Sequence, residues 1–157
     1  MKKIEILDWS FEVNMEATKV HTTNNSTDHC TCGYCCNFYE AMALVYPSVI
    51  SFLSRFGVNY QGPSELMPFL PTLMLACYRV HGKILNWGRE VLTVDGIPIV
   101  PEANDDGTFF LWVGEVELPW LQEEDADDVI SPANQPEFLL RMQEIWLQRH
   151  GDEGIFS

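Results

Sequence analysis

The chain has 157 residues, the usual size of one domain, of which 46% are hydrophobic and 20% charged. This composition excludes a disordered chain, and no window has the roughly 20 apolar residues that a membrane-spanning helix needs. The net charge is −14, and residues 90–140 contain thirteen carboxylates but no lysine or arginine. Direct nucleic-acid binding by this half is therefore disfavoured, because phosphate contacts need cations.

The N-terminus and the cysteines together indicate a cytoplasmic chain. Glu5, Asp8 and Glu12 interrupt the apolar residues near the start, so the segment lacks the continuous apolar region of a signal peptide. Four of the five cysteines lie within residues 30–36. An odd number of cysteines, clustered in this way, does not match the disulfide framework of a secreted protein.

The first half of the chain predicts one strand, a loop and two helices. Polar and apolar residues alternate over residues 4–15, which predicts a strand with one buried face. Residues 21–29 have no apolar side chain and predict a loop. Apolar residues recur at helical spacing over residues 38–45, and Pro47 suits the first turn of a second helix that ends before Gly57.

The middle of the chain predicts a short helix and then strands. The turn at residues 62–65 predicts entry into a helix that ends at Pro68 or Pro71. Residues 73–87 are apolar and rich in strand-forming types, and they predict at least one strand. The dipeptide Asp95-Gly96 between two apolar runs predicts a hairpin, because its turn needs positive φ.

The last part of the chain predicts one more strand and a C-terminal helix. The strand covers residues 109–118, and the helix covers about residues 136–150, where apolar residues fall on one face. We therefore expect a single α+β domain over residues 1–157, with helices packed on one face of a mainly antiparallel sheet. Helix 136–150 would be an appended element.

The cysteine cluster is the most distinctive chemical feature of the sequence. Cys30, Cys32 and Cys35 have the spacing C-x-C-x-x-C, in which the glycine after Cys32 allows two sulfurs to converge on one ion. Thiolates are good ligands for Zn²⁺, and a structural zinc site takes four ligands. The sequence therefore predicts a zinc site, with His29 or Cys36 as the fourth ligand.

Two other interpretations of the cluster stay open. The first is redox chemistry or a cysteine-dependent enzyme, in which a thiol at a helix start has a lowered pKa. The second is plain packing, because reduced cysteines behave as small hydrophobes.

The cluster also carries a resemblance. The run from Cys30 to Phe38, of the form C-x-C-x-x-C-x-N-F, and the later segments Val113-Gly114-Glu115 and Leu118-Pro119-Trp120 resemble a group of small bacterial proteins from Gram-positive lineages and mobile elements. The resemblance covers residues 4–124 and implies no activity. Where that group has an arginine after the third cysteine, this chain has Cys36.

The sequence contains no complete catalytic constellation, which favours a protein that is not an enzyme. The leading hypothesis is an acidic interaction module for a basic protein partner, with a cysteine loop fixed by zinc or by packing. One alternative is the thiol-dependent redox protein or enzyme. Another is a nucleic-acid mimic that blocks a DNA-binding enzyme through its carboxylates.

Overall fold

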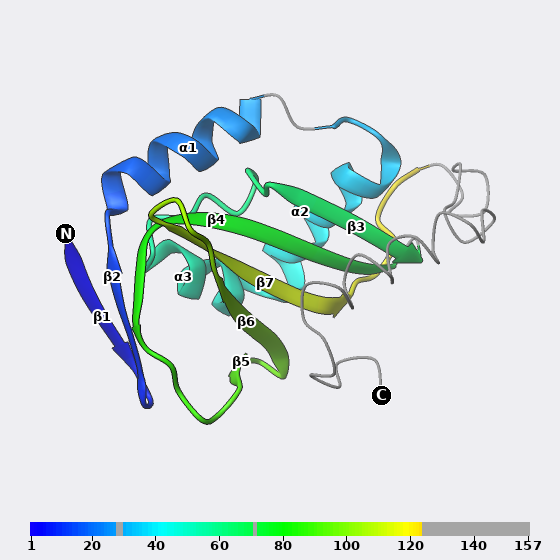
Figure 1. The fold of residues 1–157 in the computed structure, drawn as a ribbon. Helices are drawn as coiled ribbons and strands as arrows, with labels where there is room; N and C mark the ends of the chain where they lie inside the picture. Colours follow the sequence, from blue (N-terminus) through cyan, green and yellow to red (C-terminus); the bar gives the residue numbers. More distant parts are fainter. Residues whose placement is uncertain (28–29, 71, 124–157) are drawn as a thin grey trace.

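A computed structural model describes residues 1–27, 30–70 and 72–123 of the chain (Figure 1). This part of the chain forms helices and strands that confirm the α+β class. The helices are α1 (Met15–Thr27), α2 (Gly33–Val45) and α3 (Pro47–Ser54). The strands are β1 (Lys2–Ile6), β2 (Trp9–Val13), β3 (Glu65–Leu70), β4 (Leu73–Asn86), β5 (Leu92–Val94), β6 (Ile97–Ala103) and β7 (Thr108–Glu117).

All strands belong to one antiparallel sheet in the order β1-β2-β4-β7-β6-β5, with β3 paired to β4. The 14-residue β4 is its central strand. One edge of β4 pairs with β3 over residues 73–77 and with β2 over residues 82–86, while the other edge pairs with β7. A gap therefore separates β2 from β3 along the same edge of β4.

Helix α1 closes this gap. The N–H of His81 in β4 donates to Thr18 Oγ1 of α1 at 3.0 Å, and the His81 carbonyl accepts from the N–H of Asn14 at 2.8 Å. A helix side chain thus satisfies a strand-edge amide that has no strand partner. Figure 1 shows α1 running beside β4 towards the cysteine loop.

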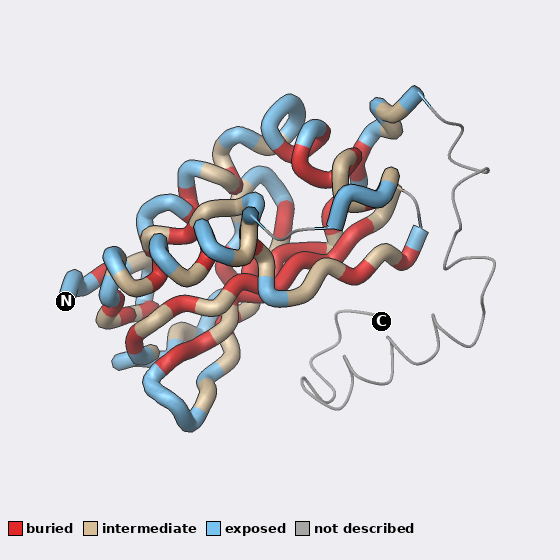
Figure 2. Tube along the Cα trace, turned by 90° about the horizontal axis from the view of Figure 1, so that it is seen from above, coloured by how far each residue is buried: buried red, intermediate tan, exposed pale blue. Residues whose placement is uncertain are grey.

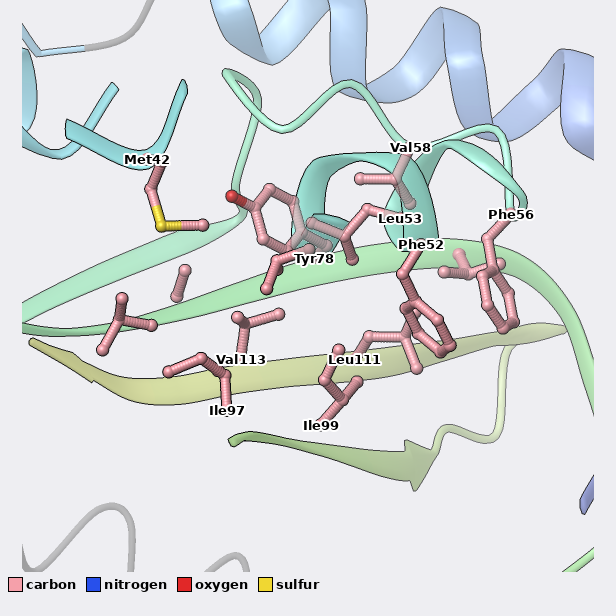
Figure 3. Packing of buried hydrophobic residues seen from close by; sticks show 14 of the residues in the cluster. Met42, Phe52, Leu53, Phe56, Val58, Tyr78, Ile97, Ile99, Leu111 and Val113 are labelled. Atoms are coloured by element: carbon pink, nitrogen blue, oxygen red, sulfur yellow. The ribbon is translucent and has the colours of Figure 1, made fainter. Parts of the chain in front are cut away.

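Helices α2 and α3 cover one face of the sheet, as the sequence predicts. Met42 of α2 and Leu53 of α3 are fully buried and lie over Tyr78, Ile99 and other residues of the sheet (Figure 3). Figure 2 shows the buried positions concentrated where the helices meet the sheet. Burial of these side chains stabilises the fold by about 1.5–3 kcal/mol each.

The other face of the sheet has a smaller apolar cluster. Alternation along β4 turns Met74, Ala76 and Tyr78 towards the helices, and it turns Leu75 and Cys77 to the opposite face. The buried members of this second cluster are Met67, Phe69, Leu75, Cys77 and Trp112. Cys77 is therefore a core residue and is not part of the cysteine cluster.

The single strand predicted for residues 4–15 is wrong, because the structure has the hairpin β1–β2 there. Leu7 lies in the turn with φ 54° and its side chain is exposed. Ile4 pairs with Phe11 across the hairpin, and both are buried. The alternation was real on both strands, but it did not reveal the turn between them.

The loop predicted for residues 21–29 is also wrong over the described part, because α1 continues to Thr27. This helix has no apolar stripe, but it starts with a capping bond from the Ala17 N–H to Asn14 Oδ1 at 3.0 Å. Thr18 and Thr22 are fully buried, and Thr22 Oγ1 accepts from the N–H of Asn59 at 2.9 Å. Hydrogen bonds therefore hold this helix in place, and the spacing of apolar residues, on which the prediction depended, does not reveal it.

The short helix predicted after residues 62–65 is wrong as well, because β3 occupies this segment and pairs with β4. Pro68 has no N–H, yet β3 accommodates it because β3 pairs only with β4 in the described sheet. The strand at residues 73–87, the Asp95-Gly96 hairpin and the strand at residues 109–118 are confirmed.

The helix predicted at residues 136–150 lies outside the described residues. Over the ranges that are described, the longest helices have 13 residues, and none has the length and apolar character that a bilayer crossing requires.

Candidate metal centre

The cysteines surround the N-terminal end of α2. Cys32 is the residue before the first helical turn, and its carbonyl accepts from the N–H of Cys36 at 3.0 Å. Cys35 lies in that first turn, and Cys30 lies in the loop before it. The Sγ atoms of Cys30, Cys32 and Cys35 all lie within 4.8 Å of one another. The three cysteines singled out by the sequence therefore come together.

The three thiols have different environments. The N–H of Cys32 donates to Cys30 Sγ at 3.4 Å, and this hydrogen bond lowers the pKa of the exposed Cys30 thiol. Cys35 is half-buried, and its burial raises the pKa of its thiol. The unpaired N–H groups at the start of α2 also favour negative charge there. Burial disfavours the negative charge of a thiolate, and a bound cation would compensate that charge.

Of the two predicted fourth ligands, only Cys36 lies among the described residues, and it is not part of this group. The Cys36 thiol donates to the carbonyl of Thr31 at 3.4 Å, and His29 lies outside the described residues. In residues 1–27, 30–70 and 72–123, the three sulfurs have no fourth His, Cys, Asp or Glu atom within the same mutual distance. All five cysteines lie among the described residues, and none of them is in a disulfide bond.

A buried asparagine anchors α2 behind the cysteines. Asn37 is fully buried, and its Nδ2 donates to the carbonyl of Pro119 at 3.1 Å. Its Oδ1 accepts from the N–H of Leu121 at 2.7 Å. The amide thus forms hydrogen bonds through both its donor and its acceptor, and it ties α2 to the segment after β7.

An aromatic contact strengthens the same attachment. Tyr34, between the second and third cysteines, is buried, and its ring meets the Trp120 ring edge-on at a centroid distance of 6.2 Å. The C-x-C-x-x-C-x-N-F segment and the Leu118-Pro119-Trp120 segment therefore pack together, although about 80 residues separate them. These two segments, which carry the resemblance in the sequence, therefore form one structural unit.

A cleft of about 570 Å³ adjoins the three sulfurs, and Cys30 and Cys35 form part of its wall. The other side chains come from α1, from α2, from the segment that enters β3, from β3 itself and from β4. They are His21, Asn25, Tyr39, Pro63, Ser64, Glu65, Leu66 and Arg79. The cleft thus lies at the end of the gap that α1 closes.

A second histidine lies beside His21 of this wall. The rings of His21 and His81 meet edge-on at a centroid distance of 5.3 Å. Burial, followed by the charges of His81 and Arg79, lowers the pKa of His21 below its ordinary value of 6.5. The lowered pKa favours the neutral form of the His21 ring.

The cleft contains one arginine held from two sides. Arg79 Nη1 donates to Asp106 Oδ2 at 2.9 Å and to Thr108 Oγ1 at 3.0 Å. Its guanidinium carbon lies 4.7 Å from the centroid of the Phe110 ring, an arrangement that fits a cation–π contact. These contacts fix the position of the cation next to the cleft.

The spacing of the sulfurs fits a thiophilic metal ion. A tetrahedral zinc ion with bonds of about 2.3 Å holds its sulfur ligands about 3.8 Å apart. Sulfurs within 4.8 Å of one another need to approach by about 1 Å or less to reach that geometry. The three cysteines can therefore hold a metal ion.

Sequence reasoning missed the cleft and the anchor. Asn37 is part of the C-x-C-x-x-C-x-N-F run, but an asparagine in that position does not by itself indicate a buried side chain. Glu65 and Arg79 come from strands whose pairing the sequence did not reveal.

Comparison of the chain with protein-family models, with curated proteins and with solved structures gave no match. The resemblance to a bacterial group therefore stays a prediction.

Proposed function

We propose that the chain is a zinc-binding protein in which Cys30, Cys32 and Cys35 hold the ion. The observation that supports this proposal is the convergence of three sulfurs within 4.8 Å from a six-residue stretch. Sulfur is the ligand type that selects zinc over magnesium and calcium, which prefer oxygen.

The local backbone favours the charged form that a metal needs. Cys32 precedes the helix and Cys35 lies in its first turn, so both thiols are near the positive end of α2. The N–H of Cys32 favours the thiolate of Cys30. Metal binding then replaces the thiol protons, so affinity should rise with pH until the thiols are ionised.

A bound ion would fix the cysteine loop to a helix that is already anchored. Tyr34 and Asn37 attach the start of α2 to the segment after β7. The loop at Cys30 and Thr31 is exposed, so the ion would supply cross-links that packing does not. Zinc removal should loosen this loop and leave the sheet folded.

The test is metal analysis of the full chain purified without chelators, by inductively coupled plasma mass spectrometry. The expected result is about one zinc per chain, which is lost in Cys32→Ser and Cys35→Ser. The matched control is Cys36→Ser, because a serine hydroxyl can keep the bond to the Thr31 carbonyl. This control should retain the metal.

Two outcomes would contradict the proposal. One is a folded wild-type chain that contains no metal and takes up none from a zinc buffer. The other is uptake that is unchanged in Cys32→Ser. Loss of 2 Da after mild peroxide treatment of such a metal-free chain would favour the redox alternative, because disulfide formation removes two hydrogens.

The predicted acidic surface for a basic partner is a separate proposal. Every carboxylate in the described part of the acidic region, residues 90–123, is at least partly exposed. This exposure is what a docking surface for a basic protein needs.

A further inference from the structure

The metal centre and the cleft share two side chains. Cys30 and Cys35 belong both to the sulfur group and to the wall of the cleft. An ion held by the three sulfurs would therefore lie at the cleft wall. The cleft volume of about 570 Å³ is within the range of small-molecule pockets, about 300–1,000 Å³.

The described residues leave the fourth coordination position of such an ion without a ligand. The Cys36 thiol is bonded to the Thr31 carbonyl, and the sulfur group has three members among residues that the structure describes. Zinc sites with three protein ligands keep the fourth position for water or a substrate. Here that position would face the cleft.

The cleft provides recognition groups away from the ion. The contacts described for Arg79 use Nη1 and the face of its guanidinium, whereas a guanidinium has five N–H donors in a planar fork that matches a carboxylate. Asn25 and Ser64 add polar groups to the same wall. Arg79 gives the cleft a cation that its contacts with Asp106, Thr108 and Phe110 hold in place.

We propose that this cleft binds a small thiol carrying a carboxylate, with its sulfur as the fourth ligand of the ion and its carboxylate on Arg79. This inference rests on the zinc site proposed above. Soft ions bound by thiolates accept a further sulfur donor. The incoming thiol loses its proton to solvent, the metal–sulfur bond forms, and a bound water leaves, so no oxidant or reductant takes part.

The test uses the full chain loaded with Co²⁺, whose visible absorption bands report the coordinating atoms. The probes are mercaptoacetate and 3-mercaptopropionate, which have a carboxylate, and 2-mercaptoethanol, which does not. We expect saturable changes of the cobalt bands with the two carboxylates. They should bind at least about tenfold more tightly than 2-mercaptoethanol, the preference that one charge-assisted hydrogen bond gives.

The variant Arg79→Gln should abolish this preference and leave 2-mercaptoethanol binding unchanged. Arg55→Gln is the matched control, because Arg55 lies at the end of α3 and is not part of the cleft wall. Thermal unfolding of both variants, followed by circular dichroism, shows that the comparison is made between folded proteins.

The outcomes separate this inference from the zinc site. Failure of Co²⁺ to bind would contradict the zinc site itself. Cobalt bands that no thiol shifts, but that His21→Ala, His29→Ala or Cys36→Ser changes, would show a fourth ligand from the protein and overturn the inference. Equal binding of all three thiols, or no effect of Arg79→Gln, would overturn it as well.

Discussion

Replacement of Asn37 by alanine tests whether the cysteine helix and the segment after β7 form one unit. The Asn37 amide is fully buried and bonds to the Pro119 carbonyl at 3.1 Å and the Leu121 N–H at 2.7 Å. Each such bond contributes about 1 kcal/mol net. The lost side-chain volume and the polar groups left without partners add to this loss, so Asn37→Ala should destabilise the fold by about 2–4 kcal/mol.

The assay is equilibrium unfolding in urea, followed by far-ultraviolet circular dichroism, at a fixed excess of zinc. Gln122→Ala is the control, because it removes an exposed bond between Gln122 Nε2 and Glu40 Oε2, and it should cost less than about 0.5 kcal/mol. A change in Asn37→Ala no larger than in this control would refute the reasoning. The attachment of α2 would then not depend on the buried amide.

Three further changes test the packing of α1 and the charge at β7. Gly62→Ala should destabilise the fold by about 1–3 kcal/mol or more in urea unfolding, because a Cβ at Gly62 would lie 1.7 Å from the Thr22 carbonyl oxygen. Thr22→Val should cost about 1–3 kcal/mol, because it leaves the half-buried N–H of Asn59 without its acceptor, whereas exposed Thr23→Val should cost little. Hydrogen bonds from Thr108 lower the pKa of Asp106 below 3.8. Its stabilising effect is therefore complete above pH 3.8 and is lost as pH falls through the folded-state pKa, so Asp106→Asn should flatten the acid limb of a stability–pH profile.

The sequence predicted those elements whose apolar residues alone define them. Helices α2 and α3 and strands β4 and β7 bury residues at regular spacing, and Pro47 and Asp95-Gly96 mark a helix start and a turn. The α+β class followed from these elements. The three sulfurs could be predicted to converge because all of them lie within six residues, where the chain has few ways to separate them.

The errors arose where polar contacts or strand pairing decided the structure. Helix α1 has no apolar stripe, and it is fixed by hydrogen bonds that Thr18 and Thr22 accept from distant backbone N–H groups. Strand β3 forms because it pairs with the edge of β4, and the residues around Pro68 alone do not indicate that pairing. The cleft combines residues from both of these segments with Arg79, so it could not be foreseen either.

X-ray absorption at the zinc edge of the purified full chain tests the central claim most directly, because it counts and identifies the atoms bound to the ion. The account predicts three sulfur neighbours at about 2.3 Å in the wild-type chain, and loss of the bound zinc in Cys32→Ser. Zinc surrounded only by nitrogen and oxygen, or a spectrum that Cys32→Ser leaves unchanged, would contradict it.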